Sequence, residues 1–155
     1  MLRVRIVAIG KNKDAWIAEG SRHYSKLLSR YATVETEIIP PLKSTSSLSP
    51  AEIKAREADR FEKAKLRGFV IALSDRGVKM DTIRLSREIE KLQNRTGEIT
   101  FMIGGAHGLD DRIIERADLV LSLSPLTFSH QLVRLVLLEQ LYRVFSLLHG
   151  GSYHK

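Results

Sequence analysis

The sequence contains no cysteine, and this absence excludes several kinds of chemistry at once. Without thiols the chain has neither a disulfide framework nor a thiolate metal site. It also lacks a thiol nucleophile, so a mechanism in which cysteine adds covalently to a substrate is excluded. Any catalysis must therefore rely on other side chains.

A long apolar run and a metal-ligand pattern are missing as well. No run approaches the ~18 residues of a membrane span, and residues 1–5 lead into a strand pattern rather than into the apolar core of a signal peptide. The histidines show no metal-ligand spacing; they are His23, His107, His130, His149 and His154. We therefore expect a cytoplasmic protein with no membrane contact and no metal ion.

Acidic residues are scarce relative to basic ones, since 18 Asp and Glu stand against 25 Lys and Arg. The resulting net charge of +7 suits a polyanionic partner. Ribosomal or transfer RNA is favoured over a membrane surface, because no strongly basic amphipathic helix is evident. The length of 155 residues predicts one domain that covers 1–155.

Strand-like and helix-like patterns alternate along the chain. Strands are expected at 3–9, 33–39, 69–73, 99–103 and 119–121, the second of them near a sheet edge, and a turn at 74–77. Helices are expected after Asp14, from Pro50 to about Leu66, after Asp81, and at Asp110 or Asp111. This alternation indicates an α/β fold with a mostly parallel sheet flanked by helices.

Three expected strand ends carry unusual residues, namely Leu73–Asp75, Gly104–Gly108 and Leu123–Phe128. Open parallel sheets bind ligands at the carboxyl ends of their strands. The glycines of 104–108 allow the backbone to approach a ligand closely, but their spacing is not a dinucleotide fingerprint. Read alone, this segment fits a tight strand-to-helix turn at least as well as a ligand cradle.

The helix expected after Asp14 carries a basic face made of Lys13, Arg22, Lys26 and Arg30. Such a face is either a solvated surface, which is the more common case, or part of an RNA footprint.

The last third of the chain is organised around a long helix from about His130 to His149. Apolar residues cover most of its circumference, so the helix must be buried on most sides. Glu139 stands one turn before Arg143, where the two side chains can pair. Arg134 lies among leucines, and its guanidinium either pairs with an acid or faces a ligand site. The pattern alone gives these two interpretations equal weight.

Residues on and around this helix resemble those of a known family. Thr127, His130, Arg134, Glu139 and the terminal Tyr153–Lys155, with Ser122–Ser124 and Leu141–Arg143, are together similar to the ribosomal RNA large-subunit methyltransferase H family of SPOUT-class enzymes. The resemblance extends over nearly the whole chain and includes Val7–Lys11 and Ile103–Leu109. One departure is Ser152, where many relatives carry a proline, and this change loosens the backbone of the tail.

The resemblance implies a SPOUT-type fold with a C-terminal trefoil knot, against which general topology rules would have argued. It also implies methyl transfer from S-adenosylmethionine to N3 of a pseudouridine in 23S ribosomal RNA, within the ribosome. The cofactor-binding residues carried over by position are Leu73, Gly104, Gly105, Leu123, Ser124, Pro125, Leu126, Thr127 and Phe128.

Three residues are candidates for catalysis in this reaction. Arg134 is the candidate for orienting the base or stabilising charge on its carbonyl oxygens. His154 is the candidate proton acceptor, because histidine titrates near neutrality. Tyr153 is suited to stack on the nucleobase.

The long helix further predicts a homodimer, because a domain of this size cannot easily cover it on all sides. In such a dimer we expect the tail of one protomer to complete the pocket of the other. Two alternatives remain open: a non-catalytic RNA-binding or ribosome-assembly factor on the same fold, and a SPOUT methyltransferase that acts on transfer RNA.

Overall fold

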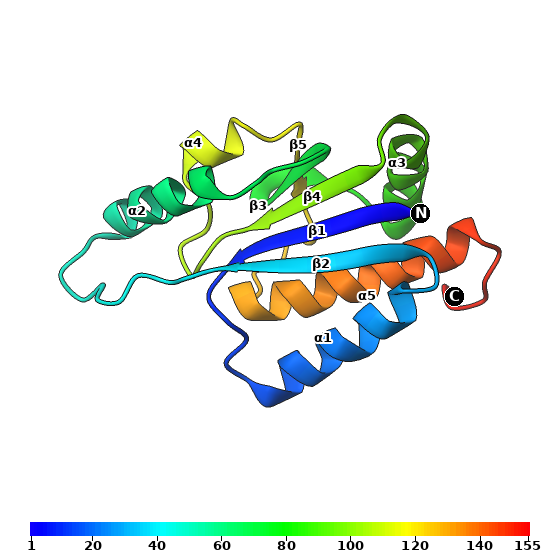
Figure 1. The fold of residues 1–155 in the computed structure, drawn as a ribbon, viewed down its shortest axis with the longest axis horizontal. Coiled ribbons are helices and arrows are strands. Elements are labelled where there is room, and N and C mark those ends of the chain that lie inside the picture. Colours follow the sequence, from blue (N-terminus) through cyan, green and yellow to red (C-terminus); the bar gives the residue numbers. More distant parts are fainter.

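The computed structural model describes residues 1–155, which form five strands and five helices in alternation (Figure 1). The strands are β1 (Leu2–Ile9), β2 (Ala32–Ile39), β3 (Phe69–Lys79), β4 (Glu98–Ile103) and β5 (Leu119–Ser122). The helices are α1 (Ala15–Leu28), α2 (Pro50–Lys63), α3 (Thr82–Arg95), α4 (Asp111–Ile114) and α5 (His130–Leu148).

The five strands form one parallel sheet in the order β2-β1-β4-β3-β5. The expected α/β fold with a parallel sheet is confirmed, and so is the edge position of β2. Because every strand runs the same way, all their carboxyl ends meet at one edge, and the loops that follow them share that edge.

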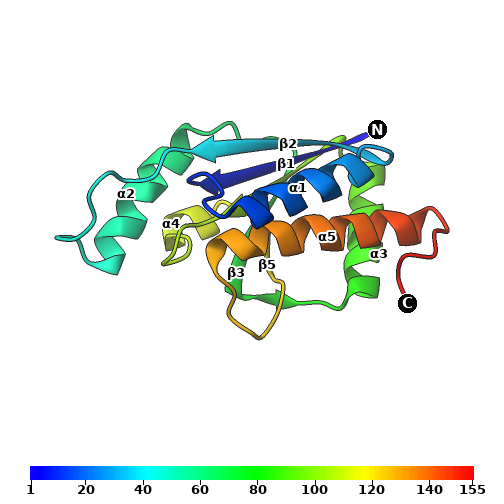
Figure 2. The ribbon, with the colours of Figure 1, turned by 90° about the horizontal axis from the view of Figure 1, so that it is seen from below.

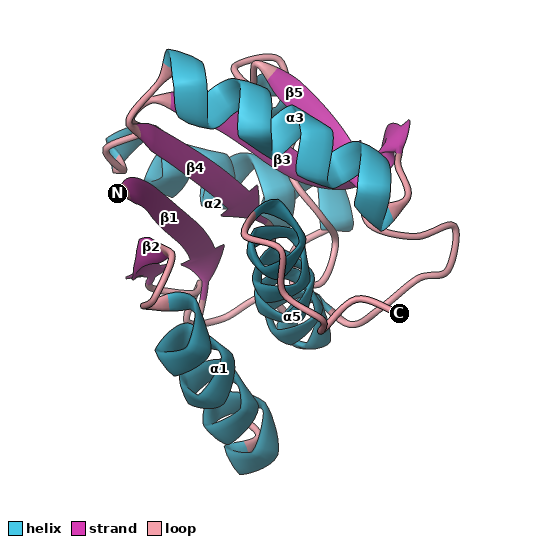
Figure 3. Ribbon diagram, turned by 90° about the vertical axis from the view of Figure 1, so that its right-hand side faces the viewer, coloured by secondary structure: helices cyan, strands magenta, loops and turns pink.

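Helices cover both faces of the sheet (Figures 2 and 3). Helices α1, α3 and α5 pack on one face around the larger core cluster, with α5 between α1 and α3. Helices α2 and α4 cover the other face, around a smaller cluster that includes Phe61 and Ile113. The apolar side chains of β1, β3 and β4 therefore lie between two helical layers, as expected for central parallel strands.

Short polar residues start most of the helices. Ser49 and Glu52 form a reciprocal capping box at α2, and the Asp81 carboxylate accepts from the Arg84 amide at α3. Asp110 caps α4, and the Ser129 hydroxyl accepts from the Leu132 amide at α5. These caps fix where each helix begins, and thereby the lengths of the loops at the carboxyl edge of the sheet.

The prediction of a turn at 74–77 is wrong, because β3 continues to Lys79. Its pairing with β5 is irregular, since Leu73 and Val78 both align with Leu121 and the residues between them are looped out. Gly77 makes this possible: a Cβ there would lie 2.6–2.7 Å from backbone atoms of Leu121 and Ser122. The interruption places Ser74 and Asp75 at the carboxyl edge of the sheet.

No helix of the chain has the length and apolarity that crossing a membrane requires.

Gly77→Ala should lower the free energy of unfolding by about 1–3 kcal/mol, because the new methyl group must displace the backbone of β5. Gly97→Ala is the matched control, since nothing lies within 4 Å of its added Cβ, and its change should stay within about 0.5 kcal/mol. Urea unfolding of both variants measures the difference. Equal stabilities would show that β5 does not need this close approach.

Candidate functional site

A pocket of about 280 Å³ opens at the carboxyl edge of the sheet. Its walls come from the ends of β3, β4 and β5, from the loops after them, and from the first turn of α5. The volume is close to the lower end of typical small-molecule sites, ~300 Å³. About half of its lining residues are hydrophobic, and the rest bring backbone and short polar groups. Such a pocket suits a ligand with one apolar ring system and several hydrogen-bonding groups.

The structure brings most of the predicted cofactor-binding residues to this one pocket. Eight of the nine line it: Leu73, Gly104, Gly105, Leu123, Ser124, Leu126, Thr127 and Phe128. Pro125 is exposed on the same loop but does not line the pocket. In this loop the Ser124 hydroxyl accepts from the Leu126 amide at 3.0 Å, which shapes the turn that carries these residues.

Further lining residues were absent from the predicted set. Asp75 and His107 lie inside two of the strand-end segments that the sequence marked, Leu73–Asp75 and Gly104–Gly108, so taking every residue of those segments would have included them. His130 and Val133 come from the first turn of α5, and their spacing of three residues places them on one side of the helix.

The glycine-rich loop after β4 depends on two residues without side chains. A Cβ on Gly104 would lie 2.5 Å from the carbonyl carbon of Gly108, across the narrow turn. A Cβ on Gly105 would lie 2.8 Å from a carboxylate oxygen of Glu57 on α2. Glu57 is buried behind this loop, and burial raises the pKa of its carboxyl group. Glu57 therefore occupies the space on the α2 side of the loop, and the opposite side of the loop faces the pocket.

His130 presents a neutral imidazole to the pocket at neutral pH. Burial lowers its pKa first, and the nearby positive charges of Arg134 and Lys13 lower it further. Its position at the start of α5 adds to this effect, because a helix N-terminus disfavours positive charge.

Arg134 is buried, with 3% of its surface exposed, and matches neither of the two expected environments. Its guanidinium donates to the carbonyl oxygens of Ile9 and Gly10, the latter at 2.6 Å, and to the Asn12 side chain at 3.3 Å. It has no acidic partner and does not line the pocket. Burial lowers its pKa. The contacts tie the first turns of α5 to the carboxyl end of β1, directly behind His130.

The C-terminal tail is folded back on the last turns of α5. Tyr153 donates to the Glu139 carboxylate at 3.1 Å and lies 3.3 Å from the Tyr24 hydroxyl. Arg143 stands over its ring at 4.6 Å and forms the expected ion pair with Glu139. The hydrogen bond with Tyr24, burial and the charge of Glu139 raise the pKa of Tyr153. This phenol therefore stays protonated at neutral pH.

The pocket includes the first turn of α5, whereas the tail leaves the other end of this helix and folds back along its second half (Figures 1 and 2). The helix has 19 residues, so its ends are about 28 Å apart. Tyr153 and His154 are held at the far end, and the Nδ1 atom of His154 is buried without a hydrogen-bond partner. The structure thus places Arg134, Tyr153 and His154 outside the pocket of their own chain.

Comparisons with known proteins agree with this architecture. A family model described as "Predicted SPOUT methyltransferase" matches residues 2–154. The chain is 42% identical over 161 residues to ribosomal RNA large subunit methyltransferase H of Acetivibrio thermocellus, covering 99% of this chain and 100% of that protein. It is 38% identical over 160 residues to the protein of the same name from Desulforamulus reducens, with both chains covered completely.

Solved structures show the same fold at low sequence identity. A probable methylase family protein from Haemophilus influenzae superposes with a TM-score of 0.57 at 16% identity, covering 98% of this chain and 70% of that chain. A probable methyltransferase from Bordetella pertussis gives 0.57 at 14% identity, with 93% and 96% covered. From its full-length relatives and the matching family model, the chain belongs to the SPOUT methyltransferases, in the family of ribosomal RNA large subunit methyltransferase H.

Proposed function

We propose that this protein transfers a methyl group from S-adenosylmethionine to N3 of a pseudouridine in 23S ribosomal RNA. The observation that carries the proposal is the meeting of three strand-end loops and the start of α5 at one pocket, in a chain of this family. The names of the two relatives above refer to the ribosomal RNA of the large subunit. The protein then acts as a single domain in the cytoplasm, on the ribosome.

S-adenosylmethionine fits the residues of the pocket. The apolar walls from Leu73, Leu123 and Phe128 suit its adenine ring, and the backbone groups of the Gly104–Gly108 loop suit its polar edges. The absence of side chains at Gly104 and Gly105 leaves the loop backbone accessible from the pocket side. Bound there, the cofactor supplies an electrophilic methyl group on a sulfonium.

The protein has three tasks in this reaction: to hold the base in line, to take up the imide proton, and to exclude water. Positioning alone can supply ~7–11 kcal/mol of the barrier. His154 remains our candidate proton acceptor and Tyr153 our candidate stacking residue. Arg134 acts from behind the pocket, because its contacts with Ile9 and Gly10 fix the turn of α5 that carries His130. Any orienting role toward the base is exerted from that position.

We propose that two chains associate through the α1–α5 face, the surface that carries Trp16, Leu132 and Val136. Gly20 contacts Leu135 of α5 closely, and on either side of this contact both helices present partly or fully exposed apolar residues. Trp16 is the largest of them and is 59% exposed. On α5, Leu132 and Val136 recur one turn apart on the side left open between α1 and α3. A second copy covers this surface by symmetry.

The dimer supplies what a single chain lacks, because the tail of a chain folds back along the second half of α5 and does not line its own pocket. Two copies of α5 that cross in opposite directions bring the tail of one protomer to the pocket of the other. The contacts of Tyr153 with Glu139, Tyr24 and Arg143 hold the tail in place for this purpose. The active site is then composite, with the pocket from one protomer and Tyr153 and His154 from its partner.

We also propose the trefoil knot that the family resemblance implies, with the C-terminal segment threaded through an earlier loop. The close approach of Gly77 to Leu121 and Ser122 supports tight packing of the chain where this segment begins.

The proposed reaction is tested with ribosomes from a strain that lacks this protein. Incubation with the purified protein and S-adenosylmethionine should yield one methyl group per large subunit, recovered as 3-methylpseudouridine on nucleoside mass analysis. Transfer RNA from the same strain is the control substrate and should stay unmethylated. Methylation of transfer RNA alone, or of no RNA at all, would refute the proposal.

Cofactor affinity should weaken in acid because of His130. The lowered pKa of His130 keeps its imidazole neutral at pH 7. At a pH below the ordinary histidine pKa of about 6.5 the imidazole becomes protonated, which adds a positive charge to a pocket that must accept a sulfonium. Calorimetric affinity for S-adenosylmethionine should be constant from about pH 8 to 6.5 and fall at lower pH. His130→Gln should remove most of this fall, whereas His107→Gln, in the same pocket, should keep it. An unchanged acid limb in His130→Gln would contradict the assignment.

A further inference from the structure

Basic residues outnumber acidic ones in the segment that contains α1. Residues 11–30 contain five basic and two acidic residues, so they carry +3 of the net charge of +7. By contrast, residues 81–98, which include α3, contain four basic and four acidic residues and no net charge. Helices α1 and α3 have the same length and flank the same helix, α5, so they form a natural comparison.

The basic side chains of this segment are all exposed and free of ion pairs. We define the α1 ridge as Lys13, Arg22, Lys26 and Arg30, each of which is exposed and none of which contacts an acidic group. Elsewhere several cations are neutralised locally: Arg112 pairs with Asp59 and Glu62, and Arg76 with Asp111. The field of the α1 ridge is therefore directed into solvent.

The α1 ridge faces away from the α1–α5 face proposed for dimer contacts. Arg22 and Lys26 are one turn apart, on the side of α1 opposite the buried Ile17 and Leu28. Trp16 stands between these two sides, beside the contact of Gly20 with α5. A second chain bound to the α1–α5 face leaves the ridge open to a further partner.

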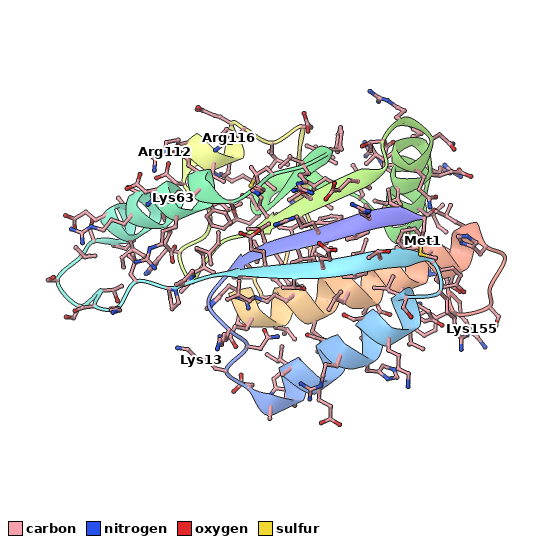
Figure 4. The ribbon with its side chains drawn as sticks, viewed as in Figure 1. Met1, Lys13, Lys63, Arg112, Arg116 and Lys155 are labelled. Atoms are coloured by element: carbon pink, nitrogen blue, oxygen red, sulfur yellow. The ribbon has the colours of Figure 1, made fainter.

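The α1 ridge starts at the pocket end of the molecule. Lys13 extends from the start of α1, whereas Lys155 lies at the opposite end (Figure 4). The segment before α1 is joined to the first turn of α5, since the Lys13 amide donates to Gln131 at 2.9 Å and Gln131 donates to the Lys11 carbonyl at 3.3 Å. Lys13 therefore lies at the pocket end of the molecule, and the other three cations of the ridge follow on the second half of α1 and just beyond it.

We infer that the α1 ridge binds phosphate groups of the RNA substrate and guides the strand that carries the target base toward the pocket. This inference rests on the proposed function, because it assigns the RNA surface of the same site. Arg22 and Lys26 lie one turn apart on α1, and their one acidic neighbour on this side is Glu19. Exposed cations at this spacing provide contacts to a phosphate backbone that require no particular base sequence. Recognition of the target nucleotide itself then belongs to the pocket and the tail.

The test compares two double substitutions that remove equal charge. The ridge variant is Arg22→Gln with Lys26→Gln, and the control is Arg84→Gln with Arg87→Gln on α3, where both arginines are exposed and unpaired. Binding to purified large ribosomal subunits from the deletion strain is measured between about 50 and 200 mM salt. Three further measurements accompany this one. Calorimetry gives the affinity of each variant for S-adenosylmethionine, sedimentation gives its oligomeric state, and a methylation assay with the wild-type protein tests the proposed function.

The ridge variant should bind the subunits roughly tenfold more weakly at 0.1 M salt, and its slope of log affinity against log salt should fall by about 1.4–1.8, because two phosphate contacts are lost. The control variant should keep the wild-type affinity and salt slope. Both variants should bind S-adenosylmethionine with wild-type affinity. Equal losses in both variants would overturn the inference, since net charge alone would then explain binding. Loss of the dimer in the ridge variant would overturn it too, and would make this face an interface between copies. Failure of the wild-type protein to methylate would count against the proposed function instead.

Discussion

The length and position of α5 are the constraint on which the rest of the structure depends. This helix begins at the wall of the pocket and ends at the turn that leads into the tail. Because the tail folds back to Glu139, one rigid element holds Tyr153 beside its second half, away from the pocket. Its buried side fills the larger core against β1, β3 and β4, and α1 and α3 hold its flanks. The side left open carries Leu132 and Val136 near the pocket end and the Glu139–Arg143 pair farther along. In the proposed dimer, a second chain covers that side and brings its tail to the pocket.

The pocket end of α5 is held by polar contacts as well as by apolar packing. Arg134 satisfies carbonyl oxygens at the end of β1, and Gln131 holds the loop before α1. A buried guanidinium with only neutral partners is costly to desolvate. The two Nη atoms of Arg134 offset part of this cost through their hydrogen bonds, whereas its Nε atom is buried without a partner. The same positive charge helps to keep His130 neutral. One turn of α5 therefore carries both Arg134, which has a structural role, and His130, which lines the pocket. The α1 ridge begins beside this turn.

Much of this arrangement can be predicted from the sequence, because it depends on local patterns. Alternating strand and helix periods predict the parallel sheet, and residues at three strand ends mark the pocket. Ser49 with Glu52 and Asp81 predict two helix starts correctly. Prediction from the sequence fails where a distant contact determines the structure. Ser74–Gly77 has the pattern of a turn, yet β3 runs on to Lys79 with an interrupted pairing, and Gly77 lies against β5. The partners of Arg134 could not be predicted either, since they are backbone carbonyls more than 120 residues away. Likewise, nothing in the terminal Tyr153–Lys155 reveals that the tail folds back onto α5.

The composite site is the central claim, and mixed dimers test it most directly. One subunit carries Gly105→Trp, which cannot fit against Glu57 without closing the pocket, and the other lacks residues 153–155. Each variant forms inactive homodimers, and two different tags allow the mixed dimer to be purified. A tail that acts in the pocket of its partner leaves one intact site in every mixed dimer, so methylation of ribosomes should return to about half the wild-type rate per dimer, as two-fold symmetry requires. A mixed dimer that binds S-adenosylmethionine through its open pocket but transfers no methyl group would contradict the account.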